Sequence, residues 1–246
     1  MRFRLYGALL LAAVLSGTSL AAGDDIPADM AAKIRATLHE RIPDLKVQAL
    51  HKSPLPGVYE IDTGDELLYT NDSGTLVFVN AHLIDTKSRE DLTSSRWNEL
   101  HAIDFNSLPF DLAIKTVRGD GSRKLVVFAD PLCPYCQQLE RDMQGVTNVT
   151  IYTFLYPLET IHKGASVKAV DIWCSKDRSA AWAKWMIQKT DPGDQRCTGA
   201  PIDKLQALGQ KLNIDSTPTM FTVDGKRVRG ALQQKDLEQL LASTHK

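Results

Sequence analysis

The stretch Phe128-Ala-Asp-Pro-Leu-Cys133-Pro-Tyr-Cys136 decides how this chain is organised, because it places a Cys-x-x-Cys motif between two regular elements. Residues 124–129 form an apolar run rich in β-branched side chains, the pattern of a strand buried on both faces. Residues 136–143 carry apolar side chains at helical spacing and are followed by Gly145, a typical residue for a helix end. The motif therefore lies at a strand-to-helix junction.

The two cysteines of this motif are predicted to differ in reactivity. Unpaired backbone N–H groups and the positive end of the helix dipole stabilise an anion at a helix start, so we expect a lowered pKa for Cys133. A thiol with a pKa of about 8.5 is about 3% ionised at pH 7, whereas one with a pKa of about 6 is about 90% ionised. Cys133 is the expected nucleophile. Cys136, one helical turn further, is the expected resolving thiol, which closes a disulfide with Cys133 and expels a bound partner.

Two other interpretations of the motif stay open. One is a pair of buried, unreactive cysteines, and the other is half of a zinc site. Successive cysteines are separated by two, 37 and 22 residues, a spacing that allows a four-cysteine zinc site without being typical of one. The buried strand, the two-residue spacing and the following helix favour the redox motif, so no metal and no cofactor are predicted.

The first residues are typical of a secretory signal peptide. Residues 1–4 include two arginines, residues 5–15 are apolar, and small residues suitable for cleavage follow at 19–22. The apolar part is too short to anchor the chain in a bilayer. We therefore expect residues 1–22 to be removed and the mature protein to be soluble and exported.

The charge of the chain argues against a nucleic-acid partner. The formal net charge is −1, and loss of Arg2 and Arg4 with the signal peptide changes it to −3. No basic stripe remains that would bind phosphate groups. Partners are expected to be recognised by shape and apolar contact.

The mature chain is predicted to contain two domains joined by a helix. Residues 23–86 combine an amphipathic helix with short β-rich runs separated by turn signals, which predicts a small α+β domain. A domain of this size buries little surface alone, so we expect it to dimerise, with a monomeric accessory domain as the alternative. Residues 87–105 predict a charged linker helix, and residues 106–246 a second domain. In the first domain the helix is expected over 27–41 and the strands over 47–50, 58–61, 66–70 and 75–79.

The second domain has the element order of a thioredoxin-like α/β domain with a helical insertion. Residues 149–155 are β-rich, so together with the strand before Cys133 they predict a βαβ unit and a parallel strand pair. Asp224-Gly225 lies between two short β-rich runs, which is a strong hairpin signal. Helices are predicted over 163–173, 177–189, 202–212 and 233–243.

An exported chain with an even number of cysteines is expected to form disulfides. If Cys133 pairs with Cys136, then Cys174 pairs with Cys197, and closing that loop would stabilise the fold by about 3 kcal/mol. The second pair has neither the two-residue spacing nor a helix start, so its predicted role is structural. The sequence alone allows two other pairings.

Four further residues are predicted to take no part in the chemistry. Trp173, Trp182 and Trp185 are spaced as in a helix, which is more typical of a core than of a platform for substrate. His162 is the nearest histidine downstream of the motif. Nothing in the sequence gives it the geometry of a base, so we expect a solvated loop residue.

These features resemble the periplasmic disulfide isomerases of the DsbC/DsbG type, which are homodimers with an N-terminal dimerisation domain, a linker helix and a C-terminal thioredoxin domain. The resemblance covers the mature chain in domain order. Its most specific parts are the Cys133 motif, Ile172-Trp-Cys-Ser-Lys176 and Ser216-Thr-Pro218.

The resemblance also implies roles for individual residues. Thr217 and a cis Pro218 would face the reactive pair and bind substrate, together with Pro134 and Tyr135 between the cysteines. Pro134-Tyr135 is the dipeptide of the DsbG branch, whereas the second cysteine pair matches the structural disulfide of the DsbC branch, which we favour.

The implied function is a periplasmic thiol:disulfide isomerase that reshuffles non-native disulfides in misfolded exported proteins. Chaperone activity and re-reduction by a membrane reductase of the DsbD type are also implied. One alternative is a DsbG-like reductase that rescues sulfenylated cysteines. Another, of a different class, is a binding module whose four cysteines hold zinc.

Overall fold

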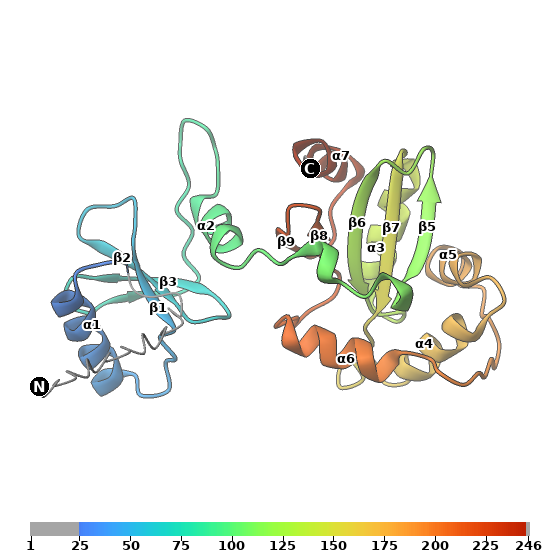
Figure 1. The fold of residues 1–246 in the computed structure, drawn as a ribbon, viewed down its shortest axis with the longest axis horizontal. Helices are drawn as coiled ribbons and strands as arrows, with labels where there is room; N and C mark the ends of the chain where they lie inside the picture. Colours follow the sequence, from blue (N-terminus) through green and yellow to red (C-terminus); the bar gives the residue numbers. More distant parts are fainter. Residues whose placement is uncertain (1–24, 245–246) are drawn as a thin grey trace, which may run out of the picture. The chain divides into compact units, whose positions relative to one another are not determined.

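The computed structural model describes residues 25–244, so the predicted signal peptide lies outside the described residues. The chain divides into two compact units at Ala81 and His82 (Figure 1). Within residues 25–244, none of the helices has the length and apolar character needed to cross a membrane.

The first unit packs one helix on an antiparallel sheet. The helix is α1 (Ala28–Arg41), and the sheet has the order β1 (Ala49–Lys52), β2 (Val58–Asp62), β3 (Leu67–Asn71) and β4 (Val77–Phe78). Ile34 and Leu38 of α1 are buried in one cluster with Leu50, Ile61 and Leu68 of the strands. The predicted helix and four strands are confirmed, although the last strand is limited to two residues.

Gly74 shows why the turn before β4 needs a glycine. Its φ of +70° is strained for any side chain, and a Cβ there would lie 3.0 Å from the backbone oxygen of Ile34. A side chain at this position would therefore strain both the turn and its contact with the helix.

The second unit begins with a short helix that is attached to the C-terminal hairpin. This helix, α2 (Leu92–Leu100), starts at Asp91, whose side chain accepts a hydrogen bond from the Ser94 N–H. Asn98 of α2 accepts from the Arg227 N–H at 2.9 Å. The linker helix was expected within residues 87–105, and the cap at Asp91 starts it only at Leu92.

A five-stranded sheet forms the centre of the second unit. Its order is β5 (Ile114–Arg118), β7 (Val149–Leu155), β6 (Arg123–Ala129), β8 (Thr219–Thr222) and β9 (Arg227–Arg229). Only β6 and β7 are parallel among these neighbours, which confirms the predicted βαβ unit. Sequence patterns did not reveal β5, because its two apolar residues, Ile114 and Val117, neither alternate with polar residues nor form a run.

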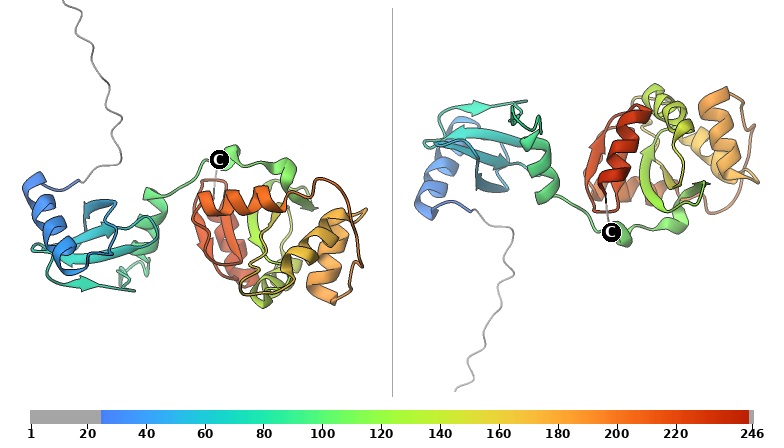
Figure 2. Two further views of the ribbon diagram at one scale, coloured as in Figure 1. Left: turned by 90° about the horizontal axis from the view of Figure 1, so that it is seen from below. Right: turned by 90° about the horizontal axis from the view of Figure 1, so that it is seen from above.

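Five helices surround this sheet, and they confirm the predicted thioredoxin-like layout. They are α3 (Pro134–Asp142), α4 (Ala165–Cys174), α5 (Arg178–Gln188), α6 (Ile202–Lys211) and α7 (Gln234–Ser243). In Figure 2, α6 is nearest the viewer in one view and α7 in the opposite view, so these two helices lie on opposite sides of the unit. The pair α4 and α5 packs beside α3.

The core of the second unit holds the end of β6 in a central position. Phe128 of β6 contacts Phe154 of β7 and Phe221 of β8, with ring centroids 5.0 and 6.0 Å apart. Trp173 and Trp182 are also buried, as predicted. Because β6 lies between β7 and β8, the Cys-x-x-Cys motif leaves the sheet from its middle.

Candidate active site

The motif is placed at the start of α3 by local geometry. Cys133 is the residue before the helix and has an extended conformation, with φ −70° and ψ 123°. Pro134 is the first helical residue, where its missing N–H leaves no hydrogen bond unmade. The Cys133 carbonyl accepts from the Gln137 N–H at 3.1 Å, the first bond of the helix. Both cysteines thus lie in the first turn.

The environment of Cys133 favours a thiolate. Hydrogen bonds from the Cys136 thiol, and then from the backbone N–H groups of Cys136 and Tyr135, lower its pKa to about 5, although burial opposes the shift. In the neutral form its Sγ lies 3.3 Å from the backbone oxygen of Thr217 and donates to it. The direction agrees with the lowered pKa expected for a helix start.

Cys136 has the opposite property. Burial raises the pKa of the Cys136 thiol strongly, and the neighbouring Cys133 raises it further. Both sulfur-bearing residues are free thiols here, 3% and 1% exposed. The outer thiol can therefore carry charge at neutral pH. The inner thiol stays protonated and donates a hydrogen bond to the outer sulfur.

Tertiary structure brings Thr217 and Pro218 to the motif from 84 residues away. The peptide bond between them is cis. Pro218 directly precedes β8, and Thr219 of β8 pairs with Phe128 of β6. Pro134 and Tyr135 are exposed beside Cys133, and Tyr135 retains 68% of its accessible surface. The residues predicted to bind substrate are thus next to the reactive pair.

His162 lies on a loop, as expected, but the expectation that it is solvated is wrong. Its ring Nδ1 lies 2.9 Å from the carboxyl group of Asp130, which is three residues before Cys133. The His162 side chain is only 21% exposed, and Asp130 is fully buried. Sequence reasoning missed this contact because 32 residues separate the two side chains. The available signal was an aspartate directly after a buried strand, which needs hydrogen-bond donors.

A second buried carboxyl group holds α3 against its neighbours. Glu140 of α3 accepts from the indole N–H of Trp182 at 2.6 Å, and Arg118 Nη2 lies 3.9 Å from its other oxygen. Burial raises the pKa of Glu140, while Trp182 and Arg118 lower it. This contact connects the reactive helix to α5 and to the edge strand β5.

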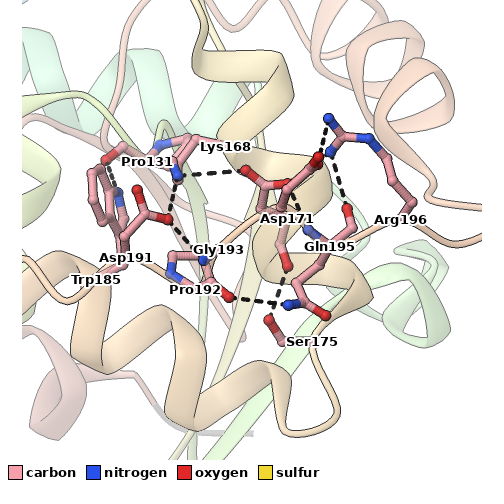
Figure 3. A network of polar contacts seen from close by, with 11 residues as sticks. Pro131, Lys168, Asp171, Ser175, Trp185, Asp191, Pro192, Gly193, Gln195 and Arg196 are labelled. Atoms are coloured by element: carbon pink, nitrogen blue, oxygen red, sulfur yellow. Dashed lines mark hydrogen bonds and ion pairs between the residues drawn. The ribbon is translucent and has the colours of Figure 1, made fainter.

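Cys174 and Cys197 form a disulfide that connects the end of α4 to the loop after α5, with their Cα atoms 5.4 Å apart. A polar network holds the same loop (Figure 3). Lys168 lies 3.4 Å from Asp171 and 2.7 Å from Asp191, and Asp171 also pairs with Arg196 at 2.8 Å. The loop before Cys197 is therefore fixed to α4 by ion pairs as well as by the disulfide.

Trp185 connects this network to the motif. Its indole N–H donates to the backbone oxygen of Pro131 at 2.7 Å. Lys168 Nζ lies 4.8 Å from the centroid of the Trp185 ring, a cation–π contact. Figure 3 shows the Trp185 side chain beside Pro131 and near the end of the lysine side chain. Trp185, which the sequence predicted only as a core residue, therefore connects the loop that carries Cys197 to the loop that carries Cys133.

Replacing both Cys174 and Cys197 by serine is expected to lower the free energy of unfolding by about 3 kcal/mol, because an unlinked chain gains loop entropy when it unfolds. Urea unfolding of the oxidised wild type and of the double variant measures the difference. The alkylation rate of Cys133 serves as the control for an intact reactive site. Equal midpoints and slopes for the two proteins would contradict the structural role.

The zinc-binding alternative is not favoured. Two of the four cysteines are bonded to each other. Among residues 25–244, no group of three or more histidine, cysteine, aspartate or glutamate side chains is arranged to hold a metal ion.

The comparisons with known proteins cover both units. Residues 24–94 match the family model of the disulfide bond isomerase protein N-terminal domain, and residues 110–245 match that of the thioredoxin-like domain. A solved disulfide interchange protein from Neisseria gonorrhoeae superimposes with a TM-score of 0.54 at 35% identity, covering 55% of this chain and 96% of that one.

Relatives that match most of the chain are named DsbC. The probable thiol:disulfide interchange protein DsbC of Bordetella pertussis is 39% identical over 215 residues, which is 87% of this chain and 75% of the relative. The thiol:disulfide interchange protein DsbC of Salmonella typhimurium is 25% identical over 245 residues, 98% of this chain and 94% of the relative. The sequence resemblance is confirmed: this chain belongs to the DsbC family of thiol:disulfide interchange enzymes.

Proposed function

We propose that the protein isomerises non-native disulfides in exported proteins, with Cys133 as nucleophile and Cys136 as resolving thiol. The observation that carries this proposal is the position of two free thiols in the first turn of α3, where their surroundings lower the pKa of Cys133 and raise that of Cys136. With a pKa of about 5, Cys133 is about 99% thiolate at pH 7. A thiol of low pKa is also a good leaving group, which isomerisation requires because the enzyme must be released unchanged.

The reaction begins when the Cys133 thiolate attacks one sulfur of a substrate disulfide. The substrate S–S bond breaks, a mixed disulfide with Cys133 forms, and the other substrate sulfur leaves as a thiolate. That thiolate can attack a different substrate disulfide, and a substrate thiolate finally displaces Cys133, so no net oxidation occurs. In the reductive route, Cys136 loses its proton, attacks Cys133 Sγ and releases a substrate that has gained two electrons and two protons.

Substrate binding is assigned to residues around the reactive pair. Thr217 and Pro218 precede the β8 strand, so an extended substrate segment can align beside them by backbone pairing. Tyr135, which is largely exposed, and Pro134 provide further contact surface next to Cys133. Such contacts discriminate little between sequences, in keeping with misfolded chains as substrates.

The first unit is assigned a dimerisation role. β4 is the edge of its sheet, and Leu76, Phe78 and Val79 at this edge are all more than half exposed. An exposed apolar sheet edge pairs readily with another chain. By analogy with the family, we also propose that the protein is a periplasmic homodimer with chaperone activity. A membrane reductase of the DsbD type would re-reduce it. Sedimentation of the mature chain tests the dimer.

The proposed activity is tested by comparing two substrates under identical redox conditions. We expect the reduced protein to refold a scrambled multi-disulfide protein faster than it reduces a protein sulfenic acid. Isomerisation uses the substrate's own free thiols, whereas each sulfenic acid consumes one enzyme dithiol. Recovered activity of the scrambled protein and loss of a sulfenic-acid probe provide the two rates. Faster turnover of the sulfenic acid would replace the proposal with the DsbG-like role.

A further inference from the structure

Asp130 is the residue through which the end of β6 contacts both reactive cysteines. Its backbone oxygen accepts a hydrogen bond from the Cys133 N–H at 3.2 Å. The Asp130 backbone also lowers the pKa of the Cys136 thiol against the effect of burial. A change in the orientation of the Asp130 backbone therefore moves the backbone of Cys133 and alters the surroundings of the Cys136 sulfur.

The side chain of Asp130 determines that orientation. It is fully buried, and a buried carboxyl group is costly unless hydrogen bonds replace its lost water. Three donors do so: the Leu132 N–H at 2.6 Å, the Leu158 N–H at 2.7 Å and the His162 ring at 2.9 Å. Two of them come from the segment after β7, so the carboxyl group connects that segment to the reactive loop.

Of these three donors, only His162 contributes through its side chain. Its ring position is set by the turn before α4, where the His162 N–H donates to the Leu158 oxygen at 2.8 Å. Glu159 accepts from the N–H groups of Gly164 and Ser166 at 2.6 and 2.9 Å, which holds this turn in shape. Because Nδ1 faces a carboxyl group, Nδ1 carries the proton and donates it. Substitution of His162 thus removes one donor and leaves both backbone donors in place.

We propose that His162 is a positioning residue for the reactive cysteine pair and acts by holding Asp130 in the orientation that presents its backbone groups to Cys133 and Cys136. The inference deepens the proposed function, since it concerns the same two thiols. It assigns a role to a residue on the loop between β7 and α4, outside the motif and outside the cis-proline segment.

Three substitutions at position 162 separate the Nδ1 contact from size and polarity. The amide nitrogen of H162N can occupy the place of Nδ1, whereas H162Q places its amide one bond further out, and H162A has no donor. Movement of the Asp130 backbone displaces the two cysteines relative to each other and weakens the hydrogen bond from the Cys136 thiol, the largest cause of the low Cys133 pKa. We therefore expect H162A and H162Q to raise the Cys133 pKa by about one unit, which lowers the thiolate fraction at pH 5 from about one half to about one tenth, or about fivefold. H162N is expected to stay within about twofold of the wild type.

The measurement is the rate of Cys133 alkylation by iodoacetamide between pH 3.5 and 8, followed by mass spectrometry. It needs no protein substrate, so its outcome is independent of whether the wild type isomerises disulfides. His82 provides a matched control, because its Nδ1 also contacts a carboxyl group, that of Asp91 at 2.7 Å, but at an exposed position. H82A should have the wild-type pH profile.

Two results would overturn the inference. One is a wild-type alkylation profile in folded H162A and H162Q, and the other is a profile of H162N that is shifted as far as that of H162Q. If H162A does not fold, as judged by circular dichroism and thermal unfolding, the comparison of H162N with H162Q decides alone, because these two side chains differ mainly in where they place the donor.

Discussion

Replacement of Cys133 by alanine is expected to reduce the refolding of a scrambled multi-disulfide protein to the uncatalysed rate. No other described residue combines a thiol with a lowered pKa, since Cys136 is buried with a raised pKa and Cys174 is bonded to Cys197. Without an ionised sulfur at the helix start, no mixed disulfide can form. The measurement is recovery of enzymatic activity by the scrambled substrate in a glutathione buffer.

The matched control is Cys136→Ala. This variant keeps the nucleophile but lacks the resolving thiol, so it is expected to accumulate mixed disulfides with substrate that are visible on non-reducing gels. The Cys133→Ala variant should form none. Refolding at the wild-type rate by Cys133→Ala would show that another group attacks the substrate, and the proposed mechanism would be abandoned.

Alkylation of Cys133 is expected to be nearly independent of pH between 6 and 8. A thiol whose pKa is about 5 is already about 90% ionised at pH 6, so its rate rises by only about 10% up to pH 8. A cysteine with the ordinary pKa of about 8.5 becomes about 75-fold more reactive over the same range. Iodoacetamide labelling at a series of pH values measures the profile, with a short cysteine peptide as the reference.

The sign of the shift also sets the expected stability of the reduced protein. A pKa lowered on folding contributes stability that is fully present above the free-thiol value of about 8.5 and is lost as the pH falls towards about 5. Because this contribution exists only while Cys133 is reduced, it makes the Cys133–Cys136 disulfide more oxidising. A labelling midpoint near 8.5 would contradict both the thiolate and this redox bias.

Local sequence accounts for the elements whose causes are close together in the chain. The apolar run before Ala129 and the helical spacing after Cys133 predict a buried strand followed by a helix, and both occur as β6 and α3. The hairpin at Asp224-Gly225 follows from turn chemistry in the same way, since Gly225 has a φ of +83°. In each case the controlling interactions lie within a few residues.

Local sequence patterns could not predict contacts between segments that are far apart in the chain. The edge strand β5 has no periodicity strong enough to be recognised, and its pairing with β7 defines it. Trp185 has the spacing of a core residue, yet its indole donates to Pro131. His162 has no sequence pattern at all, because its role depends on the turn that follows β7.

The sequence by itself determined that a thiol pair lies at the start of a helix, after a buried strand, in a chain with a second cysteine pair. These features follow from residue spacing, helix-end electrostatics and strand patterns, which act over a single turn or strand. Only the tertiary structure decided which groups surround the sulfur atoms. Thr217 lies beside the motif because β8 pairs with β6. The parallel strands β6 and β7 end side by side, so His162 in the loop after β7 can donate to the buried Asp130 after β6.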